Sequence, residues 1–174
     1  MERQGFGIRL GALIIDALIL IVLDFIIGQI FPRPVGVLRP VGGAAFIIFS
    51  NLFHLGYTST EIFKAASPGK MILGLKIGSE TGSPATQNQL ITRWAIKNSF
   101  SLLSILTIIP ILGFIFGLLA ILAGLTVVVG CFLALGVQRQ ALHDMLAHTA
   151  VYRTAPAVIG APSIAVPPPP PPVG

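Results

Sequence analysis

The sequence predicts an all-α, polytopic helical membrane protein with about four transmembrane helices, and three observations support this prediction. The chain of 174 residues is 54% hydrophobic and only 10% charged, with a mean hydropathy of +0.90. Soluble domains carry about 25% charged residues, so this chain lacks the polar surface that would cover a soluble globule. Long apolar runs and basic connecting segments complete the pattern.

The first two predicted spans lie in the amino-terminal third of the chain. Residues 8–30 form one apolar run, long enough to cross about 30 Å of hydrocarbon. The connector FPRPVGVLRP follows, and its three prolines disfavour helix. Residues 41–57 form a shorter run that contains the polar side chains Asn51 and His54. We therefore expect a long first span and a short second one.

Residues 58–98 are more polar and predict an interfacial segment between the second and third spans. Within SPGKMILGLKI, Ser67 suits a helix N-cap and Pro68 suits the first helical position. The run is too short to cross the bilayer, and its lysines flank apolar residues, which favours a position at the interface. Three residues just before the next apolar run are typical interfacial anchors: Arg93, Trp94 and Lys97.

The next apolar run, residues 100–137, contains no charged side chain over 38 residues. As one helix it would be about 57 Å long, which exceeds the thickness of any bilayer. The run must therefore turn back on itself. Glycines offer the break, and we predict the turn between Gly117 and Gly124.

Lysines and arginines predict the orientation. With four spans and both ends in the cytoplasm, nine of the 11 Lys and Arg residues lie inside, whereas three spans would place seven there. We therefore expect a multi-pass protein of the inner (cytoplasmic) membrane with both termini cytoplasmic. Orientation also explains the net charge of +5 better than nucleic-acid binding, because no basic face with interleaved aromatic residues is present.

The chain divides into a transmembrane domain over residues 1–153 and a tail over residues 154–174. The tail, APAVIGAPSIAVPPPPPPVG after its first residue, shows neither a helical nor a strand period. Its six consecutive prolines favour a polyproline II conformation. We expect a disordered, solvated cytoplasmic tail, with docking into an aromatic groove of a partner as the alternative.

Three separated motifs resemble the RDD family of integral membrane proteins. They are RLGALIID with Arg9 and Asp16, the segment SPGKMILGLKI, and RQALHDMLAHTAVYR with Asp144; Arg93 also lies where the family often has an arginine. The resemblance implies a membrane protein with a transport-type role, some members being linked to sodium/proton exchange. Two positions depart from the family pattern: an extra acid at Asp24, and His148 where the family usually has glycine.

Asp16 is the most expensive charge in the sequence, because it lies well inside the first span. Arg9 lies seven residues earlier on the same helical face, about 10.5 Å away along the axis, too far for a direct pair. Asp16 therefore needs a partner from another element, a water-filled cavity, or a proton. Arg93 or Lys97 would supply a cation. Two interpretations remain open: a structural ion pair, or a titrating carboxylate in an ion or proton path.

Two histidines are candidate proton relays, His54 in the second span and His143 near the carboxyl end. For His54 the alternative is a hydrogen-bonded core residue. Asp24 lies nearer the outer interface, and we interpret it as structural. Asp144 is expected to cap a helix or to pair with a nearby arginine. The candidate functional charge cluster therefore comprises four residues: Arg9, Asp16, Arg93 and Asp144.

The sequence does not predict an enzyme. His143 and Asp144 are adjacent, and adjacent helical residues point about 100° apart, which disfavours a catalytic dyad. Histidine spacing does not suit a metal site, and the single cysteine, Cys131, permits no internal disulfide. We expect no catalytic, cofactor-binding or metal-binding residues, and no cofactor.

Two functions from different classes fit these observations. The first is a transport-associated protein that handles cations or protons, with an intramembrane carboxylate. The alternative is a non-transporting assembly or scaffold protein, whose Arg/Asp cluster is structural and whose proline-rich tail binds a partner. Expected partners are the lipid bilayer, small cations or protons and further copies of the chain, but not nucleic acid.

Overall fold

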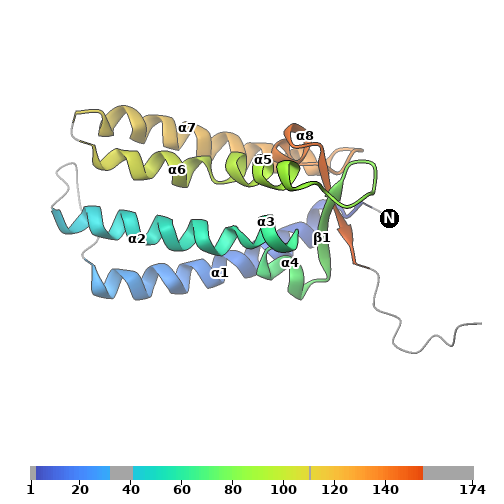
Figure 1. Cartoon of the computed structure of the whole chain (residues 1–174), viewed down its shortest axis with the longest axis horizontal. Coiled ribbons are helices and arrows are strands. Elements are labelled where there is room, and N and C mark those ends of the chain that lie inside the picture. Colours follow the sequence, from blue (N-terminus) through green and yellow to red (C-terminus); the bar gives the residue numbers. More distant parts are fainter. Residues whose placement is uncertain (1–2, 32–40, 110, 155–174) are drawn as a thin grey trace, which may run out of the picture.

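The computed structural model describes residues 3–31, 41–109 and 111–154, and it is mostly helical. Four helices lie side by side along the long axis of the molecule (Figure 1). They are α1 (Phe6–Ile30), α2 (Val41–Thr58), α6 (Ser99–Ile105) and α7 (Gly113–Cys131). Short 3₁₀ helices extend the last two: η1 (Leu106–Ile108) and η2 (Phe132–Leu135).

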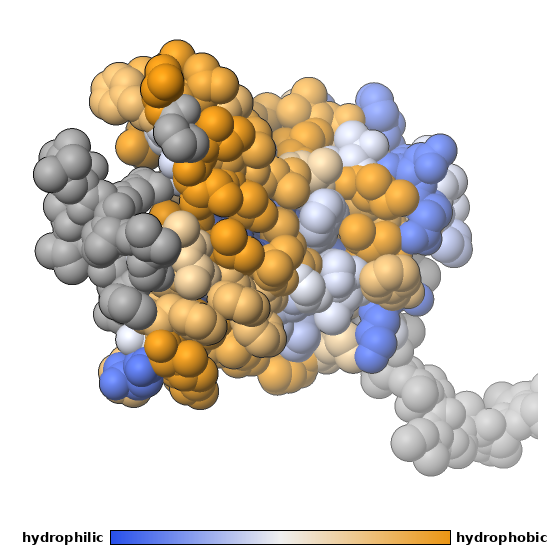
Figure 2. Space-filling model, turned by 60° about the vertical axis from the view of Figure 1, so that its left-hand side comes forward, coloured by the Kyte–Doolittle hydropathy of each residue, from blue (hydrophilic) through white to orange (hydrophobic). Residues whose placement is uncertain are grey.

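Two of these helices are long and apolar enough to cross a membrane, namely Phe6–Ile30 and Gly113–Leu135, each with a mean hydropathy of 2.7. The apolar segment Ser99–Ile108 is shorter, and α2 has 18 residues. Orange, apolar residues dominate the surface over the helices in Figure 2, and blue residues gather toward the far end. The prediction of a helical membrane protein is confirmed at this level, while the number of four spans stays a prediction.

The polar end of the bundle is a small folded layer, which we call the cap. It comprises α3 (Thr60–Lys64), α4 (Pro68–Ile72), β1 (Leu75–Ser79), α5 (Gln87–Lys97), α8 (Leu142–Leu146) and β2 (Thr149–Arg153). Figure 1 shows the amino terminus at this same end. Residues 58–98, which the sequence predicted as an interfacial segment, form most of this cap.

A two-stranded antiparallel sheet holds the cap together, so the all-α prediction was incomplete. Strands β1 and β2 pair from Leu75↔Arg153 to Ser79↔Thr149. The side chains of Leu75, Ile77 and Val151 pack against Ala12 of α1 and Leu90 of α5. The paired residues lie 70 to 78 positions apart in the sequence, and each strand has only five residues, so neither strand shows a strong pattern alone.

The long apolar run folds back earlier than predicted. The turn follows η1, and α7 then continues through Gly117 and Gly124, so the placement of the turn between these glycines was wrong. A glycine inside a helix costs only about 1 kcal/mol relative to alanine, which packing easily offsets. Gly124 instead allows close contact with α6, because an added Cβ would lie 3.2 Å from Cδ2 of Phe100.

The predictions for two segments lie wholly or largely outside the described residues. One is the proline-containing connector, of which only Phe31 is described, and the other is the proline-rich tail, of which only Thr154 is described. The backbone N–H of Thr154 donates to the carbonyl of Gly74, 2.7 Å away, so the chain remains attached to the cap up to this residue.

Candidate functional site

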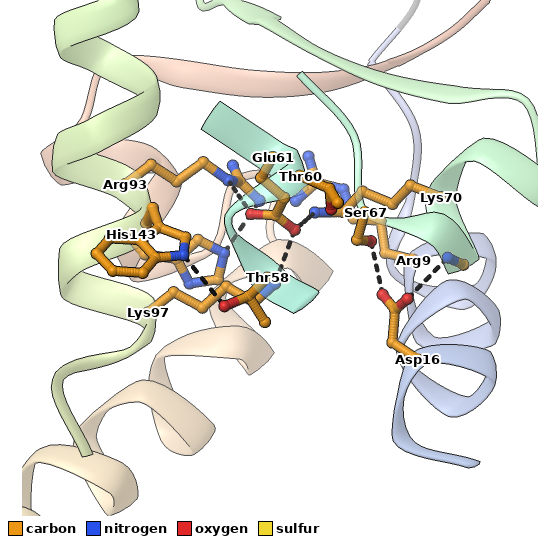
Figure 3. A network of polar contacts seen from close by, with 12 residues as sticks. Arg9, Asp16, Thr58, Thr60, Glu61, Ser67, Lys70, Arg93, Lys97 and His143 are labelled. Carbon is orange, nitrogen blue, oxygen red and sulfur yellow. Dashed lines mark hydrogen bonds and ion pairs between the residues drawn. The ribbon is translucent and has the colours of Figure 1, made fainter. Parts of the chain in front are cut away.

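Asp16 lies on α1 opposite the first turn of α4 and is 8% exposed. Its Oδ1 accepts hydrogen bonds from the hydroxyl of Tyr57 and the backbone N–H of Gly69, both at 2.7 Å. Its Oδ2 accepts from Oγ of Ser67 at 2.6 Å (Figure 3). All three donors are neutral, so dipoles rather than a cation satisfy this carboxylate.

The segment SPGK has the local structure that this contact requires. Ser67 is extended and Pro68 begins the helix, as predicted, but the Ser67 hydroxyl binds Asp16 rather than capping its own helix. Gly69 allows the backbone to reach the carboxylate: an added Cβ would lie 2.4 Å from the carbonyl oxygen of Ala12 and 2.8 Å from Asp16 Oδ1. The backbone N–H of this turn is therefore free to face an anion.

The prediction that Arg93 or Lys97 would neutralise Asp16 was wrong. Both cations bind a different carboxylate, Glu61 of α3. Of the three alternatives that the sequence left open for Asp16, a partner from another element, a water-filled cavity or a proton, the structure shows the first. The partners are the start of a helix and a tyrosine hydroxyl, neither of which was predicted.

Glu61 is the centre of a second, charged site and is completely buried. Its Oε1 accepts from Nζ of Lys70 at 2.6 Å and from Nζ of Lys97 at 2.7 Å. Nε of Arg93 lies 3.6 Å from Oε2. Sequence reasoning missed Glu61, although the chain has only six acidic residues and Glu61 is the only one between Asp24 and Glu80.

Asp144 of α8 is also completely buried, and it contacts both Arg9 and Arg93, where the sequence predicted a helix cap or a pair with one arginine. Nη1 of Arg9 lies 2.6 Å from Oδ2, and Nη1 of Arg93 contacts Oδ1. The backbone N–H of Ala141 donates to Oδ2 at 3.1 Å, so this carboxylate also caps its own helix. Arg93 thus joins Glu61 to Asp144, and α1, α3, α5 and α8 share one ionic network.

The residues expected to anchor the chain at the interface face inward instead. The side chain of Arg93 is only 2% exposed. Nε1 of Trp94 donates to Oγ1 of Thr58 at 3.1 Å, and Lys97 binds Glu61. Lys70, expected at the interface, is likewise buried. The anchor prediction was wrong because Lys70, Arg93 and Lys97 all bind the buried carboxylate of Glu61, which was not recognised as their partner.

His143 lies in the same network. Its Nε2 is 3.3 Å from Nη2 of Arg93 and 3.5 Å from Oδ1 of Asp144. The expectation that adjacent residues 143 and 144 would point apart was wrong, because both side chains converge on one guanidinium. Burial, together with the charges of Arg93, Lys97 and Lys70, lowers the pKa of His143 well below its ordinary value and keeps the ring neutral.

The other titratable groups of the cap respond to burial and to one another. Burial alone would raise the pKa of Glu61, but Lys70, Lys97 and Arg93 outweigh it and hold this pKa well below its usual range. Burial lowers the pKa of Lys70 to about 7, against the opposing effect of Glu61. Burial likewise lowers the pKa of Arg93 to about 10. The carboxylate is therefore charged at neutral pH, while Lys70 is poised to lose its proton.

A series of polar side chains runs inside the bundle from the cap toward its other end. Ser50, His54 and Thr58 recur every four residues and therefore share one face of α2. Ser50 donates to Asp24 of α1, and Asn98 contacts both Thr58 and His54. One further polar pair joins α2 to α6, where Oγ of Ser104 donates to Oδ1 of Asn51. We call all of these residues the polar line: Asp24, Ser50, Asn51, His54, Thr58, Asn98 and Ser104.

Comparison with known proteins assigns the chain to a family. Neither the curated proteins nor the solved structures compared with it gave a significant match. The sequence model of the RDD family matches residues 3–148, a range that contains both buried carboxylate sites and the whole polar line. Because this match covers most of the sequence, the chain belongs to the RDD family, whose members are membrane proteins.

Proposed function

We propose that this protein is a transport-associated protein of the inner membrane that moves protons or cations along the polar line. The observation that carries this proposal is the position of Asp24 and His54 on facing helices, inside the bundle. Titratable side chains within membrane helices are costly, and they often mark ion or proton paths. In this protein His54 interacts electrostatically with Lys97 of the cap, and Lys97 is paired with Glu61.

The proposed orientation is multi-pass, with both termini in the cytoplasm. The two ends of the described chain meet in the cap, where Arg3 forms a β-bridge with Tyr152 of β2. Both ends therefore lie on the same side of the membrane in this proposal. Most of the lysines and arginines belong to the cap or to the start of α1. The positive-inside rule therefore assigns the cap to the cytoplasmic side.

The polar line, rather than Asp16, is the part of the molecule suited to carry protons. Asp16 is held by three neutral donors and buried against a helix start, so both of its oxygens are already engaged. Asp24 is partly exposed and has a hydroxyl neighbour, and an imidazole such as that of His54 exchanges protons readily. Asp16 would then hold α1 against α4 while the polar line conducts.

The test is a set of matched carboxylate variants in proteoliposomes. Asp24→Asn keeps the shape of the side chain and its contact with Ser50, so it should abolish proton flux without changing the melting temperature. Asp16→Asn should lower the melting temperature and the membrane abundance, because its amide cannot accept all three donors. Normal flux in a stable Asp24→Asn protein would refute the polar line as the path.

The alternative is a non-transporting assembly or scaffold protein, and the complete engagement of Asp16, Glu61 and Asp144 favours it. In this alternative the charges hold the helices together, and the tail or a second copy of the chain supplies the interaction. Wild-type protein that shows no flux under sodium, potassium or proton gradients, but forms a stable oligomer in detergent, would support this alternative.

A further inference from the structure

The cap contains more buried positive charge than negative charge. Four cations surround two carboxylates: Arg9, Lys70, Arg93 and Lys97 against Glu61 and Asp144. The side chains of these cations are between 2% and 21% exposed, and both carboxylates are fully buried. His143 is held neutral, so it adds no charge. With every lysine protonated, the cluster carries an excess of two positive charges.

We infer that this cluster makes the cytoplasmic end of the polar line selective for protons over sodium and potassium ions, with Lys70 as the group that exchanges the proton. The inference rests on the proposed function and names the ion that the path accepts. It concerns residues of α3, α4 and α5 rather than the intramembrane carboxylates.

A metal cation would find no free oxygen ligand in the cluster. Oε1 of Glu61 already binds two ammonium groups, and Oε2 faces the guanidinium of Arg93. Both oxygens of Asp144 contact arginines. In the described part of the chain, no group of three or more His, Cys, Asp or Glu side chains is arranged to hold a metal ion. Sodium and potassium require several oxygen ligands, and a net positive charge repels them.

A proton can pass the same point without a vacant ligand site. Lys70 and Lys97 both lie within 2.7 Å of Glu61 Oε1, so one carboxylate oxygen links the two ammonium groups. The ammonium of Lys70 gives one proton to water on the cap side and becomes a neutral amine. The amine then takes the next proton, which arrives from Lys97 through this oxygen, and Lys97 is reprotonated from the polar line.

Lys70 is better suited to this exchange than its neighbours. The groups facing it are Glu61 of α3 and Arg93 and Lys97 of α5, so two cations compete with it for one carboxylate. Loss of its proton reduces the excess charge and leaves Glu61 paired with both other cations. Arginine holds its proton far too strongly for this role, and Lys97 is more exposed. The pKa of Lys70, lowered by burial to about 7, agrees with this geometry.

The experiment compares proton flux in proteoliposomes that contain choline, sodium or potassium thiocyanate, under the same imposed pH gradient. Thiocyanate crosses the bilayer and compensates the charge that protons carry. An internal pH-sensitive dye reports the rate. We expect equal rates in the three salts. A rate that requires sodium or potassium would overturn the inference and leave the polar line as a cation path.

The matched variants are Lys70→Arg and Lys64→Arg. Lys70→Arg keeps the positive charge beside Glu61 but cannot release a proton near neutral pH, so flux should be lost. Lys64 is exposed at the end of the neighbouring helix α3, and its variant should conduct normally. Full flux in Lys70→Arg would overturn the role of Lys70. If Lys70→Arg does not fold, the comparison of salts still decides ion selectivity with wild-type protein.

Failure of the proposed function gives a different result. Wild-type protein with no flux in any of the three salts would refute proton movement itself, and the inference with it. Flux that is equal in the three salts, lost in Lys70→Arg and kept in Lys64→Arg supports both.

Discussion

Asp16 and Glu61 are two buried carboxylates that the same cap satisfies in opposite ways. Asp16 has three neutral donors, one of them a backbone N–H at the start of α4. Glu61 has three cations and no neutral donor among the contacts described above. Helix α4 contacts both residues. The Asp16 site needs the backbone of α4 to come close to the carboxylate, whereas the Glu61 site needs the charge of Lys70.

The difference shows how the position of a carboxylate along the bundle determines its partners. Asp16 lies on the long apolar helix α1 against the start of α4, where a backbone N–H and two hydroxyl groups reach it. Glu61 belongs to the cap, where Lys70, Arg93 and Lys97 can meet it without entering the hydrocarbon. The stability of the protein should therefore change by different amounts when a charge is removed from one site, when a larger side chain is introduced at the other, and when the pH is raised.

Removing the charge of Glu61 should have the largest effect. In Glu61→Gln, three buried cations lose their shared carboxylate, and breaking a buried ionic site typically costs about 3–5 kcal/mol. We expect low membrane abundance and a much lower melting temperature in detergent. Glu80→Gln is the control, because the Glu80 side chain is 42% exposed and pairs with the exposed His148. Equal stability of the two variants would contradict the ionic account of the cap.

Removing space beside Asp16 should have the next largest effect. In Gly69→Ala, the new methyl group collides with the backbone of Ala12 and with the Asp16 carboxylate, and such overpacking costs about 1–3 kcal/mol. Gly56→Ala is the matched control, because nothing lies within 4 Å of the Cβ position of this helical glycine. The melting temperatures of the two variants are compared in the same detergent. A Gly69→Ala protein as stable as Gly56→Ala would show that the fold does not need α4 to lie this close to Asp16.

The pH dependence of stability should separate the charged site from the neutral one. The pKa of Lys70 is about 7 when folded and about 10.4 when unfolded. Between these values the unfolded chain binds more protons, so stability rises with pH. Raising the pH from about 6.5 to about 8 should stabilise wild type by about 1 kcal/mol relative to Lys70→Gln. Parallel melting curves across this range would rule out titration of Lys70.

Removing one donor from Asp16 should have the smallest effect. In Tyr57→Phe, Oδ1 keeps its bond to the backbone of Gly69, and Oδ2 keeps Ser67. The expected loss is about 1 kcal/mol, the ordinary net value of one hydrogen bond. Thermal unfolding measures it against wild type. A loss as large as that of Glu61→Gln would mean that the three donors act as one unit rather than separately.

The sequence predicted those features that depend on long or rare patterns. The first span was expected over residues 8–30 and α1 covers Phe6–Ile30, because one uninterrupted apolar run defines it. The contact of Asp144 with Arg9 and Arg93 was also predictable, since so few charges are available to pair. Short or non-local features escaped prediction. The paired strand residues lie 70 to 78 positions apart in the sequence, and Glu61 lies in a polar stretch where an acid usually faces water.

The network of the cap joins α1 to α8, which has a consequence for the biosynthesis of the protein. Arg9 and Asp144 are separated by 135 residues, and a ribosome adds about 5–20 residues per second. Arg9 therefore waits about 7–27 s for its carboxylate. During this interval the intervening helices are made, but Arg9 lacks the carboxylate of Asp144, and Arg93 has Glu61 but not Asp144. Closure of the cap therefore requires synthesis through α8, and a chain that stops before this helix would leave Arg9 without its carboxylate.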